Sequence, residues 1–189
     1  MDSITHGFDF LIIAQESGTN QYIGITNIDF RLIRFRPAIG WKDRATGTKL
    51  NSNNRNQVDH IIEYVENSSE FEIYFSEIVS CISELIKINP EKHLEFYQRA
   101  GPLNLKRHAF QMLPSVGRSR ALEMQESRLS GDWSNFSEIA KDVRFNPEEA
   151  LAHRYAEEIL DLTLKPRLLE LLVRVNISLE EPISEPPSK

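Results

Sequence analysis

The spacing of apolar residues changes near residue 69, and this change limits the possible folds of the chain more than any other feature. Before it, apolar residues fall in short runs, Phe8–Ala14, 22–36 and Val58–Val65, separated by segments rich in Gly, Ser and Asn. Such runs are typical of β-strands, and several of them predict a small barrel or curled sheet at residues 1–66. After it, apolar residues recur every third or fourth position. This spacing predicts an α-helical domain at residues 67–165, and so an α+β fold.

Helix start and stop signals divide the second part of the chain. Ser69 followed by Glu72 forms a capping-box pattern, and Asn89-Pro90-Glu91 combines a cap, a proline and a carboxylate at a second start. Gly101-Pro102 is a stop signal. We therefore expect helices at Ser69–Lys87, Lys92–Ala100, Leu103–Leu113, Arg118–Leu129 and Phe136–Val143, and a further helix that opens at Asn146-Pro147.

The end of the chain has a different pattern. Apolar and polar residues alternate in residues 169–177, which favours a strand at residues 166–178 that returns to the barrel. Residues 179–189 contain three prolines and few apolar side chains, so we expect a disordered tail there.

Charge is distributed unevenly along the chain, whose net charge is −6. Residues 61–85 carry six acids and no base, whereas residues 86–130 carry eight bases and four acids. Between Gly101 and Leu122 there are four bases and no acid. Because salt screens charges beyond about 8 to 10 Å, this basic segment is expected to attract a polyanion despite the acidic remainder.

The basic segment contains the pattern RHAFQMLPSVGRSRALEM at residues 107–124, which predicts a helix–hairpin–helix within residues 103–129. Leu105 and Met112 are expected to face inward from the first helix. Val116 is expected to fill the centre of the turn, and Gly117 to supply a residue with positive φ.

The second helix of this motif begins directly after the turn, so its free backbone amides and the positive end of its dipole form an anion site. Arginine suits a phosphate because its planar fork can donate two hydrogen bonds. Such hairpins usually carry glycine where Ser115 stands; serine approaches a phosphate less closely, but its hydroxyl can donate a hydrogen bond. The candidate nucleic-acid-binding residues are Lys106, Arg107, His108, Ser115, Val116, Gly117, Arg118 and Arg120.

Three segments of the chain resemble those of a known family. Phe96-Tyr97-Gln98-Arg99-Ala100-Gly101-Pro102, Leu113-Pro114-Ser115-Val116-Gly117 and Phe136-Ser137-Glu138-Ile139 are similar to its segments FFxxAGP, LPGIG and SFEDI. The family is archaeal and uncharacterised, and its members join an OB-like barrel to a helix–hairpin–helix region and are described as predicted RNA-binding proteins. Their genes tend to lie beside those for ribosomal proteins and rRNA dimethylation. The resemblance, good over residues 57–162, therefore implies an OB-like barrel and a role near the ribosome or translation.

We therefore expect a non-enzymatic protein that grips the backbone phosphates of structured RNA, with ribosomal RNA and ribosomal proteins as possible partners. Two alternatives stay open. The same hairpin occurs in DNA-binding proteins of repair and recombination, and phosphate contacts carry little base information. Alternatively, a degenerate hairpin would leave a protein-interaction scaffold whose acidic faces dock a basic partner.

Other classes of site find no support in the sequence. The five histidines are scattered and Cys81 is the only cysteine, so we expect no metal, cofactor or catalytic site. No apolar run approaches the roughly 18 to 20 residues that span a bilayer, and the N-terminal residues do not resemble a signal peptide. A cytoplasmic protein without a membrane partner is expected.

Overall fold

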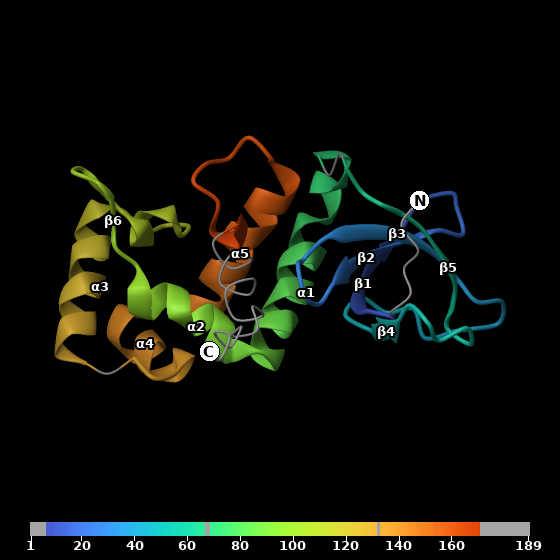
Figure 1. Cartoon of the computed structure of the whole chain (residues 1–189), viewed down its shortest axis with the longest axis horizontal. Coiled ribbons are helices and arrows are strands. Elements are labelled where there is room, and N and C mark those ends of the chain that lie inside the picture. The colour runs from blue at the N-terminus through green and yellow to red at the C-terminus, as the bar shows by residue number, and fades with distance from the viewer. Residues whose placement is uncertain (1–6, 67–68, 132, 171–189) are drawn as a thin grey trace, which may run out of the picture.

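The computed structural model describes residues 7–66, 69–131 and 133–170 of the chain (Figure 1). Its first part is a five-stranded antiparallel sheet in the order β4-β1-β2-β3-β5. Register shifts in the β1–β2 and β3–β5 pairs bend the strands, and no pairing of β4 with β5 is found among the described residues. The predicted OB-like barrel is thus a curled half-barrel. Its strands are β1 (Asp9–Gln15), β2 (Tyr22–Thr26), β3 (Leu32–Pro37), β4 (Lys49–Asn51) and β5 (Val58–Tyr64).

Both faces of the half-barrel are buried at the central strands β1 and β2, which explains why β1 has an unbroken apolar run. Successive side chains of a strand point to opposite faces. Phe10 and Ile12 accordingly pack inside the half-barrel, whereas Leu11 and Ile13 belong to the core formed with the helices. The half-barrel and the helical region therefore share one apolar core.

The second part of the chain is helical, so the predicted α+β fold class is confirmed. A 3-10 helix precedes α1. The side chain of Asn146 caps α5 by accepting the amide of Glu149, as the sequence indicates, and Asn135 caps α4 in the same way through the amide of Glu138. The cap predicted at Asn89 is wrong, because its side chain accepts no amide of α2. The elements are η1 (Ser69–Tyr74), α1 (Phe75–Ile88), α2 (Pro90–Arg99), α3 (Arg118–Ser130), α4 (Phe136–Val143) and α5 (Pro147–Leu160).

The predicted helix at Leu103–Leu113 is wrong. This segment forms a hairpin of β6 (Pro102–Asn104) and β7 (Arg107–His108), followed by the 3-10 helix η2 (Ala109–Met112). The side chain of Asn104 explains the difference, because its Oδ1 accepts the backbone N–H groups two and three residues further on and closes a turn instead of a helix.

Only the first residues of the strand expected at residues 166–178 lie within the described part of the chain, and they are not extended. Leu168–Glu170 are helical there, and the carboxylate of Glu158 accepts the N–H groups of Leu168 and Leu169 at 2.9 and 3.0 Å. An acceptor at this position satisfies amides at a helix start, which opposes the extended backbone expected from the alternation. Residues 171–178 and the expected tail at residues 179–189 lie outside the described residues.

The elements follow the long axis of the molecule. In Figure 1 the half-barrel lies at one end, α3 and α4 lie at the other, and α1 and α5 stand between them.

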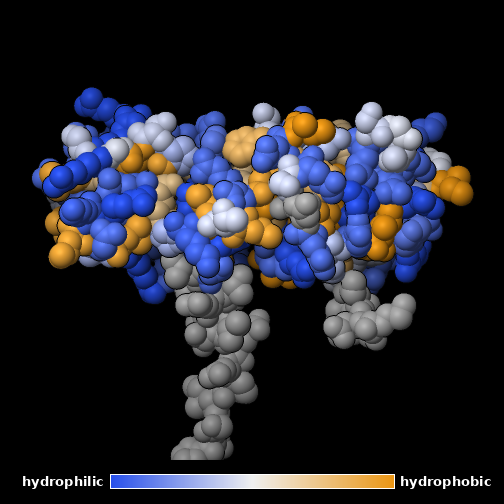
Figure 2. All heavy atoms as spheres, turned by 90° about the horizontal axis from the view of Figure 1, so that it is seen from above, coloured by the Kyte–Doolittle hydropathy of each residue, from blue (hydrophilic) through white to orange (hydrophobic). Residues whose placement is uncertain are grey.

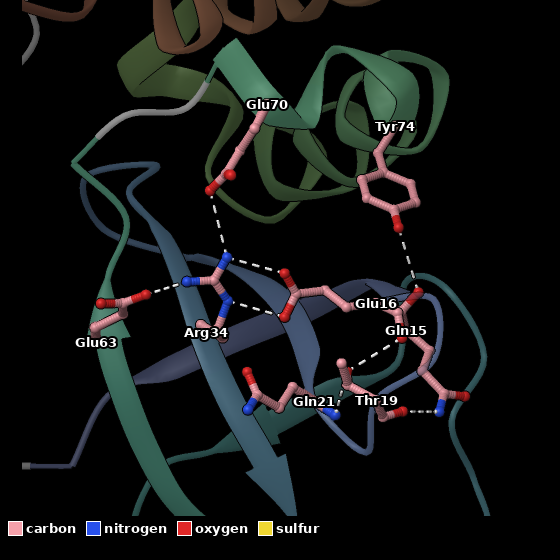
Figure 3. A network of polar contacts seen from close by, with 8 residues as sticks. All are labelled: Gln15, Glu16, Thr19, Gln21, Arg34, Glu63, Glu70 and Tyr74. Atoms are coloured by element: carbon pink, nitrogen blue, oxygen red, sulfur yellow. Dashed lines mark hydrogen bonds and ion pairs between the residues drawn. The ribbon is translucent and has the colours of Figure 1, made fainter.

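Arg34 of β3 links the sheet to η1 through ion pairs (Figure 3). Its guanidinium donates to both carboxylate oxygens of Glu16 at 2.8 and 2.9 Å, and also to Glu63 of β5 and Glu70 of η1. These carboxylates, Glu16 foremost, raise the pKa of Arg34.

Candidate nucleic-acid interface

The Leu113–Gly117 turn leads into α3 as expected, but its left-handed residue is Ser115. Ser115 has φ 62°, whereas Gly117 has φ −80° and ψ −178°, which is ordinary extended backbone. The expectation of positive φ at Gly117 is therefore wrong. Positive φ falls at the position where such hairpins usually carry glycine, so the turn keeps its shape although the residue has changed. Val116 is buried in the shared core.

No described side chain caps the backbone amides at the N-terminus of α3. Gly117 is the N-cap, and the first intrahelical hydrogen bond runs from Ala121 N to Gly117 O at 2.9 Å. The N–H groups of the three preceding residues, 118–120, consequently have no intrahelical acceptor. The other described α-helices all carry an acid in the first turn, whereas the first turn of α3 holds two arginines and no acid. The positive end of its dipole is therefore not neutralised locally.

Four of the predicted basic residues lie on the hairpin and the first turn of α3. Lys106, Arg107 and Arg118 are exposed, and no acid of the described residues pairs with them. Arg120 is half-buried, and its guanidinium carbon lies 5.6 Å from the ring centroid of Phe145. Three cations are thus free to meet an anion, and the fourth also packs on the protein.

His108 takes a different role from its neighbours. Its ring is buried and accepts the N–H of Phe110 at 3.2 Å, while its own backbone N–H donates to Gln111 Oε1 at 2.9 Å. Burial, with the nearby positive charge of Arg128, lowers the pKa of His108. A neutral ring that caps η2 stabilises the scaffold, so His108 is not among the groups that face a ligand.

Sequence reasoning missed Arg128, which joins three elements. Its Nη1 donates to the carbonyl oxygens of Ala100 at 2.6 Å and Tyr97 at 3.2 Å, and its guanidinium carbon lies 5.3 Å from the ring centroid of Phe110. Arg128 therefore fixes the end of α2 and the base of the hairpin against α3. An arginine in the last turn of a helix matches a common dipole pattern, so nothing in the sequence indicated these contacts.

The hairpin and α3 form one surface. β7 contacts α3, and in Figure 1 the hairpin lies beside the upper end of that helix. Seen from above in Figure 2, this end of the molecule shows hydrophobic side chains among hydrophilic ones. Leu105 is one of the exposed apolar residues, with an exposed fraction of 106%, although the sequence placed it in the core.

Within the described part of the chain, no group of three or more His, Cys, Asp or Glu side chains is placed to hold a metal ion. None of the helices described here has the length and apolar character needed to cross a membrane.

Comparison with known proteins places the chain in a family. Similarity to the uncharacterised protein MJ0038 of Methanocaldococcus jannaschii amounts to 21% identity over 107 residues, which are 57% of this chain and 49% of that protein. The matched segment thus spans about half the length of this relative. The crystal structure of Af1531 from Archaeoglobus fulgidus has a similar fold, with a TM-score of 0.71 and 17% identity over 86% of this chain and 98% of that one. The family model described as "Protein of unknown function (DUF655)" matches residues 19–170, and the chain therefore belongs to the DUF655 family.

Proposed function

We propose that this protein binds structured RNA through backbone phosphates at the N-terminus of α3. The observation that carries the proposal is the first turn of that helix, in which amides without an intrahelical acceptor stand beside Arg118 and Arg120 and which contains no acid. The exposed hairpin residues Lys106 and Arg107 extend the same positive surface.

The chemistry of this surface suits a phosphate ester. Backbone amides at a helix start donate to phosphate oxygens, and the helix dipole favours negative charge there. Arg118 is free of an ion pair within the described residues, so binding a phosphate does not require a bridge to be broken. The Ser115 hydroxyl, exposed at the turn before the helix, adds a further possible donor.

The preference for RNA rests on the resemblance of three segments to a family whose members are described as predicted RNA-binding proteins, because amides and guanidinium groups contact RNA and DNA phosphates alike. The same resemblance supports a role close to the ribosome or translation. A DNA-binding protein and a protein scaffold remain as outcomes of the test.

The test is a titration of the whole chain with a fluorescently labelled RNA stem–loop at several salt concentrations. Each lost phosphate contact takes about 0.7 to 0.9 from the slope of log affinity against log salt, so Arg118→Ala and Lys106→Ala should each flatten it by roughly that amount. Lys87→Ala is the matched control, since Lys87 is exposed on α1 and pairs with Glu84. We call the proposed binding of phosphates at the N-terminus of α3 the phosphate grip. A slope that Arg118→Ala leaves unchanged would refute the phosphate grip, and tighter binding of a DNA duplex would favour the DNA alternative.

A further inference from the structure

The turn between β6 and β7 carries a leucine, Leu105, that no other described side chain covers. Leu105 has an exposed fraction of 106%, and Leu103, in β6, one of 37%. Single exposed leucines are common on protein surfaces. Leu105 differs from most of them because the chain holds it at the tip of a short, firmly anchored hairpin.

Hydrogen bonds fix the tip and the base of this hairpin. Asn104 Oδ1 accepts the backbone N–H groups of Lys106 at 2.9 Å and Arg107 at 3.0 Å, and Ala109 N–H donates to Gly101 O at 2.9 Å. The Asn104 side chain and the backbone hydrogen bond at the base therefore set the position of the Leu105 main chain in the absence of a ligand. A hairpin whose main chain is already ordered loses less entropy on binding than a flexible loop would.

The positive charge next to Leu105 indicates which kind of partner would cover it. Lys106 and Arg107 follow it directly, and no acid occurs between Gly101 and Leu122. β7 also contacts α3, so the phosphate surface adjoins the hairpin. A partner must offer negative charge to the cations and an apolar surface to the leucine at one place. Nucleic acid has both, with phosphates outside and base faces inside.

We propose that Leu105 is a wedge that enters RNA at an unstacked step, so that the protein prefers stems interrupted by an unpaired nucleotide over continuous stems. This proposal rests on the proposed phosphate grip. Apolar side chains of nucleic-acid-binding proteins insert between base steps and unstack them, and the cost is least where a base is already unpaired. The grooves of a continuous A-form stem display no base faces to a short hairpin.

The experiment uses the whole chain and two RNA stem–loops that differ only in one bulged nucleotide, with 2-aminopurine beside the bulge. The protein should bind the bulged stem about tenfold more tightly, as expected for burial of a leucine side chain, and 2-aminopurine fluorescence should rise. Leu105→Ser should remove the preference and the fluorescence rise, while affinity for the continuous stem stays within about twofold because the phosphate contacts persist. Ile39→Ser is the matched control, since Ile39 is equally exposed, at 103%, but lies in a loop of the half-barrel.

The outcomes separate the wedge from the grip. Equal affinity of the unchanged protein for both stems, or a preference that survives Leu105→Ser, overturns the wedge and leaves the grip in place. RNA affinity that does not respond to Arg118→Ala overturns the grip itself. Binding of phosphatidylglycerol vesicles that depends on Leu105, without a preference for the bulged stem, shows that the leucine meets lipid, and this also overturns the wedge.

Discussion

Single substitutions at Ser115 and Gly117 test which of the two residues has positive φ in the turn before α3. Ser115 holds φ 62°, a conformation that costs an L-residue about 1 to 2 kcal/mol. Ser115→Gly removes this strain, but glycine also gains freedom in the unfolded chain, which offsets about 0.4 to 1 kcal/mol. The expected net result is a rise of about 0.5 to 1 kcal/mol in the free energy of unfolding.

Gly117→Ala gives the complementary measurement. At φ −80° and ψ −178° alanine is unstrained, and a Cβ at this position would meet no heavy atom within 4 Å. Alanine reduces the freedom of the unfolded chain, so this variant should also gain about 0.4 to 1 kcal/mol. Ser115→Val should lose stability, because a β-branched residue tolerates positive φ poorly.

Urea denaturation followed by circular dichroism gives these free energies, and a change of about 1 kcal/mol corresponds to roughly 2 to 4 °C in Tm for a chain of this size. Loss of stability in Ser115→Gly, or a loss of more than about 1 kcal/mol in Gly117→Ala, would contradict this assignment of φ. Either result would mean that positive φ is needed at Gly117 instead of Ser115.

Two further predictions concern the buried His93 and the half-buried Arg128. Burial against Tyr155 and its neighbours lowers the pKa of His93 from 6.5 to about 4, so the unfolded state binds more protons between these values. Stability should be complete above about pH 6.5 and fall by about 3 kcal/mol as the pH drops to about 4, and His93→Phe should flatten this part of a measured pH–stability curve. Arg128→Met removes the donor to Ala100 O and should lower the free energy of unfolding in urea by about 1.5 to 3 kcal/mol. Arg99→Met, at a side chain 77% exposed, should cost less than about 1 kcal/mol, and equal losses would contradict the anchoring role of Arg128.

The parts of the fold that were predicted correctly depend on local patterns. The apolar run of β1 and the asparagine cap of α5 act within a few positions of the chain, so they are visible in the sequence. The helix expected at Leu103–Leu113 failed for a local reason too. The single Asn104 side chain competes for the amides that a helix would need, and apolar spacing does not register this competition.

The candidate site was predictable only in part. The exposed cations Lys106, Arg107 and Arg118 lie in the acid-free segment between Gly101 and Leu122, so the sequence alone draws attention to them. The contacts that hold this surface in place join residues far apart in the chain: Arg128 reaches carbonyl groups 28 to 31 positions away. Such pairings depend on the tertiary arrangement, and no spacing rule indicates them.

The shared apolar core joins the two ends of the molecule. Buried side chains continue from Leu11 and Ile13 in the half-barrel, through α1, to Ala121 and Met124 under α3. Tightly packed interiors resist compression and bending. A molecule bound at the hairpin end and another bound at the half-barrel would therefore sit on one continuously packed body, and they would not compete for the same surface (Figure 1).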